Sequence, residues 1–244
     1  MTRVALITGA SSGIGAAIAR DLGARGYHLA LAARRRDALE GVAQHIRNVG
    51  GQALPLECDV SVGPSIATCV ERALAEFGRV DVLVNNAGVM HSGNIVGADT
   101  RDWRTMIDVN LMGLMLMTHA VLPHMLEQGS GHIINISSVA GRIITAGNGV
   151  YNVTKWGVNV FSEALRQEVH KENIKVTIVG PGVVATELLD KIANPEARAG
   201  FQQWAASMTT LQAEDIAAAV SYALEAPGHV NVNEILLRPL DQQR

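Results

Sequence analysis

A tyrosine and a lysine four residues apart could move a proton to or from an oxygen atom. Tyr151 and Lys155 fall in a predicted helix, where this spacing places both side chains on one face. Tyrosine is a poor base at its usual pKa of about 10, but a neighbouring ammonium favours the tyrosinate. The pair could therefore exchange a proton with an alcohol or carbonyl oxygen near neutral pH.

Two more polar residues could take part in this chemistry. Ser138 follows the apolar run 132–136, which predicts a buried strand, and its hydroxyl could hold the substrate oxygen beside Tyr151. Asn110 lies inside a predicted long helix, where asparagine is a poor helix former. It could hold a water molecule, or it could be an amide whose hydrogen bonds are satisfied in the core, and the residue pattern leaves both open.

A glycine-rich segment near the start of the chain could bind phosphate. Residues 8–15 follow the apolar run 4–7 and open a predicted helix, whose first amide groups and dipole attract anions. The glycines would let a dinucleotide approach the backbone. The G-x-x-x-G-x-G spacing departs from the usual G-x-G-x-x-G, so a tight structural turn is the alternative. The predicted contacts are Gly9, Ser11, Ser12, Gly13, Ile14 and Gly15.

The end of the second predicted strand indicates which dinucleotide would bind. An acidic residue there usually holds the adenosine ribose of NAD, but this chain has Ala33, followed by Arg34 and Arg35. Guanidinium groups suit a ribose 2′-phosphate, so the sequence predicts NADP(H). The alternative is that the arginines are a solvated helix start and that Asp37 is the acid that binds the ribose.

The elements that position these residues alternate along the whole chain. Short apolar runs predict buried strands and longer amphipathic runs predict helices, which together indicate an α/β fold with a parallel sheet covered on both faces. Pro55 suggests that its strand lies at a sheet edge, and Ser61 could cap the helix that follows. The predicted strands are 4–7, 29–32, 53–58, 82–84, 132–136, 176–179 and 233–237, and the main predicted helices start at 16 and span 37–48, 62–77, 100–128, 152–170 and 213–225.

Composition narrows the class of protein. Hydrophobic residues make up 48% of the 244 and charged residues 18%, which excludes a disordered chain. The net charge of −3 gives no sign of a nucleic-acid or membrane partner. Cys58 and Cys69 lack metal-ligand spacing, and with no export signal they suggest a reducing, cytoplasmic compartment. No stretch is expected to be long and apolar enough to span a bilayer, no catalytic metal is expected, and one domain is predicted over 1–244.

The motifs taken together resemble the short-chain dehydrogenase/reductase family. Residues 8–15, 85–88, Asn110, Ser138, and Tyr151 with Lys155 occur in the family's order, and 181–186 resembles its P-G-x-x-x-T segment. The resemblance implies a single Rossmann-type, doubly wound domain with a seven-stranded parallel sheet. It also implies a catalytic tetrad of Asn110, Ser138, Tyr151 and Lys155.

The resemblance further implies contacts to the cofactor. Asp59 and Val60 would contact the adenine, Asn86, Ala87 and Gly88 a ribose, and Thr186 the nicotinamide carboxamide, with Pro181, Gly182 and Val184 beside it. Lys155 would lower the pKa of Tyr151 and bind the nicotinamide ribose, and Asn110 would hold a water that links Lys155 to solvent. The expected activity is reversible hydride transfer between NADP(H) and an alcohol or carbonyl compound.

The substrate is less clear from the sequence. The segment 233–240 resembles two NADP-dependent subgroups, the clavulanic-acid-type aldehyde reductases and the serine-type 3-hydroxy-acid dehydrogenases. A non-catalytic NADP-binding sensor is the alternative from another class. The expected pocket comprises Met90, His91, 139–143, Val183 and a lid over about 187–210, in which Phe201 and Trp204 could form an apolar wall.

Two further expectations concern charge and assembly. Arg142 could bind a substrate carboxylate or simply lie on the surface, and His91 could line the pocket or be a surface histidine. The family usually pairs its two long helices between subunits. We therefore expect a homodimer or homotetramer, with apolar faces on 100–128 and 152–170 forming the contact.

Overall fold

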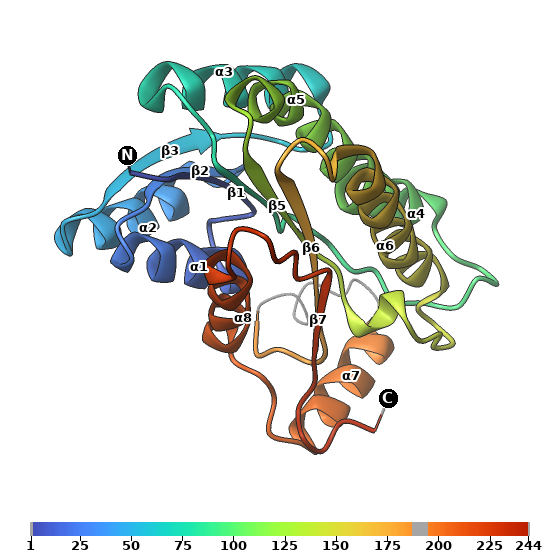
Figure 1. Ribbon diagram of the computed structural model, residues 1–244. Helices are drawn as coiled ribbons and strands as arrows, with labels where there is room; N and C mark the ends of the chain where they lie inside the picture. The colour runs from blue at the N-terminus through green and yellow to red at the C-terminus, as the bar shows by residue number, and fades with distance from the viewer. Residues whose placement is uncertain (1, 187–194, 244) are drawn as a thin grey trace.

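The computed structural model describes residues 2–186 and 195–243 and contains one seven-stranded parallel sheet (Figure 1). The strand order is β3-β2-β1-β4-β5-β6-β7, which is the doubly wound Rossmann arrangement and confirms the predicted fold class. The assignment of the whole chain to one domain with a lid stays a prediction. The strands are β1 Val4–Thr8, β2 His28–Ala33, β3 Gln52–Glu57, β4 Val82–Asn85, β5 Gly131–Ile136, β6 Ile174–Pro181 and β7 Glu234–Leu237.

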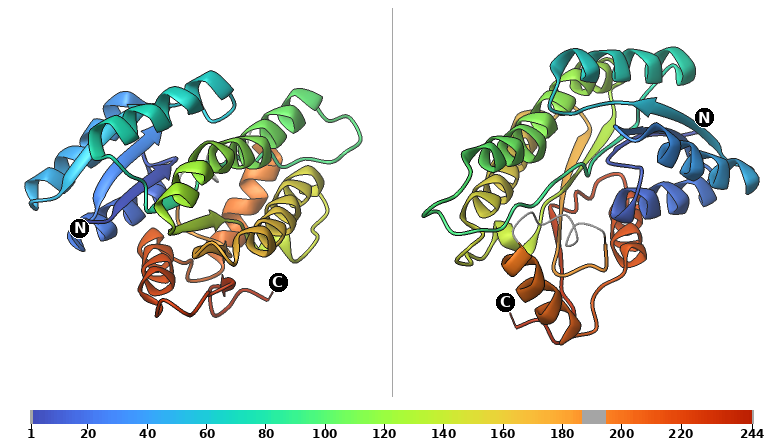
Figure 2. Two further views of the ribbon diagram at one scale, coloured as in Figure 1. Left: turned by 45° about the horizontal axis from the view of Figure 1, so that its top comes forward. Right: turned by 180° about the vertical axis from the view of Figure 1, so that it is seen from behind.

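Helices cover both faces of the sheet, as Figures 1 and 2 show. One apolar core joins α1, α2 and α8 to one face, and a second joins α3, α5 and α6 to the other. Because both faces are covered, the inner strands are apolar throughout, and all five residues of β1 are buried. The helices are α1 Gly13–Ala24, α2 Arg36–Asn48, α3 Gly63–Phe77, α4 Thr100–Ile107, α5 Gly113–Gln128, α6 Gly149–Val169, α7 Pro195–Ala206 and α8 Ala213–Glu225.

The β3 strand, which contains Pro55, pairs only with β2 and lies at one edge of the sheet. A proline has no amide hydrogen for a second neighbour, so it is tolerated at this position. The prediction of an edge strand from Pro55 is therefore confirmed. Most other element ends lie within three residues of the predicted ones, and α8 coincides with its prediction.

Three local expectations are wrong. The predicted helix 100–128 is interrupted by a π-helical turn, Asp108–Met112, between α4 and α5. Val62, not Ser61, precedes α3 as its N-cap, because the Ser61 hydroxyl and amide both donate to the Asp59 carboxylate.

The third correction concerns the membrane criterion. The run Thr100–Gln128 has 29 residues with a mean hydropathy of 1.4 over its most apolar window, which is long and apolar enough to cross a bilayer. The expectation that no stretch reaches this length is therefore wrong. In the fold, 39% of that window is buried, and Met117, Val121 and Met125 pack against the sheet.

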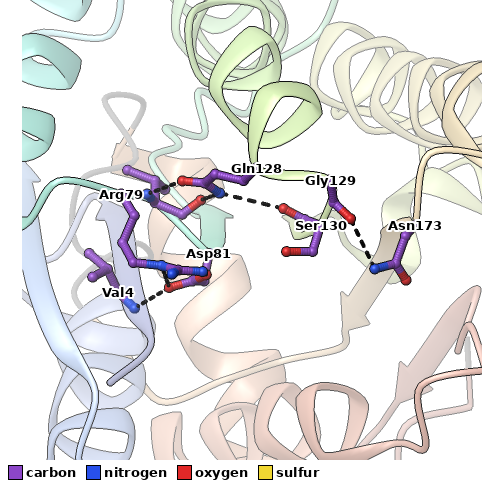
Figure 3. A network of polar contacts seen from close by, with 8 residues as sticks. Val4, Arg79, Asp81, Gln128, Gly129, Ser130 and Asn173 are labelled. Carbon is purple, nitrogen blue, oxygen red and sulfur yellow. Dashed lines mark hydrogen bonds and ion pairs between the residues drawn. The ribbon is translucent and has the colours of Figure 1, made fainter. Parts of the chain in front are cut away.

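A network of polar contacts ties the elements together at the amino edge of the sheet (Figure 3). The Asp81 carboxylate accepts hydrogen bonds from the amide of Val4 at 2.8 Å and from the Arg79 guanidinium. The Gln128 side chain bonds both the amide and the carbonyl of Val80. This edge lies opposite the one where the glycine-rich turn ends β1, so the network concerns stability rather than chemistry.

Replacing Asp81 should destabilise the protein strongly. The Asp81 side chain is 9% exposed, and Asp81→Ala would remove the acceptor of the buried Val4 amide and the ion pair with Arg79, whose side chain is 31% exposed. Loss of the acceptor of a buried amide costs about 1–3 kcal/mol, and the partly exposed ion pair adds at most about 1 kcal/mol. Urea unfolding should show this loss, whereas Glu40→Ala, which breaks the exposed pair with Arg47, should cost at most about 1 kcal/mol. Equal losses in the two variants would contradict the assignment.

Candidate active site

A cavity of about 1250 Å³ lies at the carboxyl edge of the sheet. Its wall is formed by the segments that follow β1, β2, β3, β4, β5 and β6, with α7 on one side. The strand order reverses between β1 and β4, and ligands of open α/β sheets bind in the crevice at such a point. The cavity exceeds the usual size for a small ligand, which leaves room for a dinucleotide together with a substrate.

The glycine-rich turn forms one wall of the cavity. Gly9 and Gly13 have φ angles of +66° and +52°, which side chains other than glycine rarely adopt. A Cβ atom on Gly9 would lie 2.9 Å from the Cα of Ala87, so the turn needs glycine for close packing as well. Ser11, Ser12, Gly13 and Ile14 line the cavity at the amino end of α1, where phosphate would meet backbone amides.

Gly15 differs from the other residues predicted to touch a cofactor. A Cβ atom there would overlap the Gly9 carbonyl oxygen and lie 2.5 Å from the Asn86 amide nitrogen. Gly15 therefore allows the turn to pack onto the β4 loop, and the described wall of the cavity passes through Gly13 and Ile14 instead. Gly15 thus has a packing role, and the expectation that it also contacts a cofactor stays a prediction.

Thr8 joins the glycine-rich turn to the loop after β4. Its hydroxyl accepts hydrogen bonds from the amides of Asn86 and Ala87, both at 3.0 Å. The Asn86 side chain returns a bond to the Thr8 carbonyl at 2.9 Å. Asn86, Ala87 and Gly88 are thereby held along the cavity. The sequence places Thr8 in the motif but does not reveal this duty, because the partner is 78 residues away.

Two arginines stand at one end of the cavity. Arg34 and Arg35 both line it beside Ala33, and the Arg35 guanidinium donates to the Ser12 hydroxyl at 2.7 Å. Asp59 and Val60 lie along the same end. Burial alone would raise the pKa of the Asp59 carboxyl. Hydrogen bonds from Ser61 and the positive charge of Arg34 outweigh this effect, so the pKa lies below its ordinary value.

This end of the cavity favours an anion over an uncharged ribose. Asp37, the alternative ribose acid, falls in the first turn of α2, and the described wall runs through Arg34 and Arg35 instead. Two guanidinium groups together with the hydroxyls of Ser11 and Ser12 make a donor set suited to a phosphate.

Ser138, Tyr151 and Lys155 meet at the other end of the cavity. The α6 helix begins three residues earlier than predicted, at Gly149, which brings Tyr151 into its first turn. Burial raises the pKa of Tyr151 to about 12, and a hydrogen bond with Ser138 opposes this rise. Burial lowers the pKa of Lys155 to about 8.

The Lys155 ammonium lies near the ring of Tyr151 but makes its hydrogen bond to the backbone. It donates to the carbonyl of Ile136 at 3.0 Å and lies 5.8 Å from the centre of the Tyr151 ring. Burial raises the pKa of Tyr151, which favours the protonated phenol, and a phenol in this form is suited to donate a proton. The expectation that Lys155 lowers the pKa of Tyr151 together with a bound nicotinamide stays a prediction.

Asn110 supports the cavity from behind. It lies in the π-helical turn and is 1% exposed. Its side-chain oxygen accepts from the Val89 amide at 2.8 Å, and its nitrogen donates to the Val89 carbonyl at 2.8 Å and to the Thr154 hydroxyl at 3.3 Å. These bonds use both N–H groups and one lone pair of the side-chain oxygen, so Asn110 is a satisfied core amide. The expectation that it holds a water linking Lys155 to solvent stays a prediction. Its structural role is to fix the loop after β4 next to Gly88.

The substrate end contains predicted and unpredicted residues. Of the expected wall, Met90, Val139, Ala140, Ile143, Val183 and Trp204 line the cavity. Arg142 and His91, for which the sequence left two roles open, make contacts elsewhere: Arg142 forms an ion pair with Glu234 at 2.6 Å, and the His91 ring lies 3.5 Å from Asp102. Residues 187–194 and the side chain of Phe201 fall outside the described part of the chain. The lining residues that sequence reasoning missed include Ser92, Gly93, Asn94, Ile144, Thr145, Ala146, Gly147, Asn148, Asn152, Gln242 and Gln243.

Asn152 explains how the segment after β5 keeps its shape. Its side-chain nitrogen donates to the carbonyls of Ala140 and Ile143, both at 2.7 Å. This holds Val139 and Ile143 against the cavity mouth, close to Ser138. An asparagine directly after Tyr151 in a helix was the one hint of this duty in the sequence.

The described residues contain no group of three or more His, Cys, Asp or Glu side chains that could hold a metal ion. The expectation of a metal-free reaction stays a prediction.

Comparison with known proteins defines the class. Residues 3–197 match the short chain dehydrogenase family model, and the chain belongs to this family of oxidoreductases. It is 40% identical over 243 residues to an uncharacterized oxidoreductase of Staphylococcus saprophyticus, covering 98% of this chain and 97% of that protein.

Solved structures agree with this membership. A serine dehydrogenase in a closed form complexed with NADP+ matches with a TM-score of 0.91 at 34% identity, over 99% of this chain and 96% of that one. An alcohol dehydrogenase from Thermococcus sibiricus, complexed with 5-hydroxy-NADP, matches with a TM-score of 0.88 at 31% identity, over 100% and 99%. Both are bound to NADP or a derivative of it.

Proposed function

We propose that this protein is an NADP(H)-dependent oxidoreductase that interconverts an alcohol with an aldehyde or ketone. The observation that carries the proposal is the convergence of Ser138, Tyr151 and Lys155 at one end of a cavity whose other end holds Arg34 and Arg35. A non-catalytic sensor would need the arginines and the glycine-rich turn but not the three groups at the opposite end.

The described residues fit an NADP molecule laid along the cavity. Gly9 and Gly13 leave room for the pyrophosphate, Arg34 and Arg35 suit the 2′-phosphate, and Asp59 and Val60 lie where the adenine would rest. Asn86, Ala87, Gly88, Pro181, Gly182, Val184 and Thr186 line the remaining length. When bound, the dinucleotide supplies or accepts the hydride.

The chain's own groups handle the proton. In the reducing direction, the neutral phenol of Tyr151 donates its proton to the substrate oxygen as that oxygen gains charge. The Ser138 hydroxyl, which is hydrogen-bonded to Tyr151, holds the same oxygen in place. The Lys155 ammonium lies beside the phenol. There it can bind ribose hydroxyl groups and stabilise the negative charge that develops on Tyr151 when the proton leaves.

The experiment is a measurement of absorbance at the NADPH band, with NADPH and a panel of aldehydes and ketones, and with NADP+ and a panel of alcohols and 3-hydroxy acids. We expect loss of NADPH absorbance with one or more carbonyl compounds and little reaction when NADH replaces NADPH. A protein that binds NADPH but turns over no member of the panel, in either direction, would favour the sensor.

A serine-type 3-hydroxy-acid dehydrogenase is the second candidate activity. The serine dehydrogenase with a TM-score of 0.91 favours it, as does the resemblance of 233–240 to that subgroup. Against it, the Arg142 guanidinium is already paired with Glu234. Formation of NADPH from NADP+ with serine or 3-hydroxybutyrate distinguishes this activity from reduction of simple aldehydes.

The pH dependence of reduction follows from the two buried groups. The pKa of Lys155 is lowered to about 8, so its ammonium is present below this pH and is lost as pH rises through it. Tyr151 remains neutral up to a pKa of about 12 and does not limit this range. We expect kcat/KM for reduction to fall about tenfold per pH unit above pH 8. Lys175→Met should leave this profile unchanged, and a profile flat up to pH 10 would contradict the assignment.

We also propose that the protein is a homodimer or homotetramer in the cytoplasm. Met112 just before α5, Leu116 on α5, and Val153, Trp156 and Val160 on α6 are exposed apolar residues. The α5 and α6 helices lie along the same side of the molecule, both in the front view (Figure 1) and in the view from behind (Figure 2, right). A second copy of the chain, whose equal apolar surface would be buried in turn, is the partner that suits this face.

Light scattering after size exclusion tests the assembly. We expect a mass at least twice the 25.9 kDa of one chain, and a shift toward the monomer for Val160→Arg because a buried charge would oppose the contact. Val49→Arg, at another exposed apolar position, should keep the wild-type mass. A wild-type protein that is monomeric at a concentration of about 50 µM would contradict the proposal.

A further inference from the structure

The residues after β7 fold back onto the cavity. The amide of Gln242 donates to the carbonyl of Pro239 at 3.0 Å, which closes a tight turn. Leu240, at the tip of this turn, is 100% exposed, whereas Gln242 is 6% exposed. The turn therefore directs one amide side chain inward, and that side chain lies in the wall of the cavity with Trp204 of α7.

The Gln242 side chain holds the end of β6. Its carbonyl oxygen accepts a hydrogen bond from the Val183 amide at 3.0 Å. The amide of Gly182 donates to the Leu237 carbonyl at 2.7 Å. The successive amides of Gly182 and Val183 are therefore held by the last residue of β7 and by the turn that follows it. A Cβ atom on Gly182 would overlap the Gln242 oxygen and lie 3.1 Å from Pro239, so this contact requires glycine at position 182.

The segment that Gln242 holds, residues 181–184, contacts one of the proposed reacting groups. Residues 181–184 line the cavity, and the Pro181 carbonyl accepts a hydrogen bond from the Ser138 hydroxyl at 3.3 Å. Val183 is buried, so its amide would lose its acceptor if the Gln242 side chain were removed. A buried amide without a partner is unfavourable, and the segment would shift to find another acceptor.

Resting on the proposed function, we propose that Gln242 is a positioning residue for the half of NADP(H) that lies opposite the arginines. Its side-chain oxygen fixes the backbone of 181–184, and that backbone orients both the Ser138 hydroxyl and the face against which the nicotinamide would rest. The adenosine half depends on Arg34, Arg35 and the glycine-rich turn, which stand at the other end of the cavity. The two halves should therefore respond differently to changes at position 242.

Calorimetric titration with two ligands tests the proposal. One ligand is NADPH, and the other is adenosine 2′,5′-bisphosphate, which has only the phosphate and adenosine half. For Gln242→Leu we expect the Kd for NADPH to rise about tenfold while the Kd for adenosine 2′,5′-bisphosphate stays within twofold of wild type. Gln242→Glu keeps an oxygen acceptor for Val183 and should restore NADPH binding to within about threefold. Gln44→Leu, the same change at an exposed glutamine of α2 outside the printed cavity wall, should bind both ligands like wild type.

The outcomes distinguish a failure of the positioning role of Gln242 from a failure of the proposed function. Wild-type affinity for NADPH in Gln242→Leu, or equal losses for both ligands, would overturn the positioning role, and so would a Gln242→Glu protein that behaves like Gln242→Leu. A wild-type protein that binds neither ligand would refute the proposed function and this role with it. Should Gln242→Leu fail to fold, Gln242→Asn, which is one methylene group shorter, takes its place with the same expected pattern.

Discussion

Tyr151→Phe should reduce kcat for carbonyl reduction by about a hundred- to ten-thousandfold while the protein still folds and binds NADPH. The phenol is buried at the end of the cavity, shares a hydrogen bond with Ser138 and stays neutral to a pKa of about 12. Phenylalanine keeps the ring and its packing but has no proton to donate. The loss should therefore appear in turnover, with the affinity for NADPH within a few-fold of wild type.

The matched control for this variant is Tyr222→Phe. Tyr222 lies on α8 and is 67% exposed, so removing its hydroxyl should change neither kcat nor stability. Stopped-flow measurement of NADPH oxidation gives the turnover, and thermal unfolding shows that both variants are folded. A Tyr151→Phe protein with near-normal kcat would show that another group delivers the proton.

Arg34→Ala should weaken NADP+ binding about ten- to a hundredfold and leave NAD+ binding nearly unchanged. A hydrogen-bonded charge pair with phosphate contributes about 1.5–3 kcal/mol, and each 1.4 kcal/mol is tenfold in affinity. NAD+ has no 2′-phosphate and so has nothing to lose at this position. Titration of both dinucleotides against the wild type and the variant gives the ratio directly.

Arg36→Ala is the control for the cofactor preference. Arg36 starts α2, is exposed, and follows the two arginines that line the cavity. Its removal takes away the same charge from nearly the same place and should change NADP+ affinity no more than about twofold, as expected for a screened surface charge. Equal losses for NAD+ and NADP+ in Arg34→Ala would mean that the arginine supports the fold of the site rather than reading the phosphate.

Local patterns predicted the fold class because they depend on residues close in the chain. Runs such as that of β1 are apolar on both faces, which only a strand inside a covered parallel sheet requires, and Pro55 marked the edge strand. The order of motifs carried the family resemblance. The π-helical turn at Asn110 escaped prediction, because it depends on a hydrogen-bonded fit to Val89 across 21 residues.

Site residues that belong to a sequence motif were predicted, whereas site residues that act through a contact between distant segments were missed. Tyr151, Lys155 and Ser138 reach one cavity as expected. Gln242 carries no motif, and its partner Val183 is 59 residues away, so only the folded chain brings them together. Arg142 was open to interpretation because the sequence does not show that Glu234, from β7, takes its charge. The effect of burial on Tyr151 and Lys155 likewise depends on packing and not on their spacing.

A crystal structure of the protein with NADP+ tests the central claim most directly, since that claim is a single orientation of one ligand in one cavity. We expect the 2′-phosphate to contact the guanidinium groups of Arg34 and Arg35, and the nicotinamide ring to lie against residues 181–184 beside the hydroxyl of Tyr151. A dinucleotide bound in the reverse orientation, or with its nicotinamide away from Ser138 and Tyr151, would contradict the account.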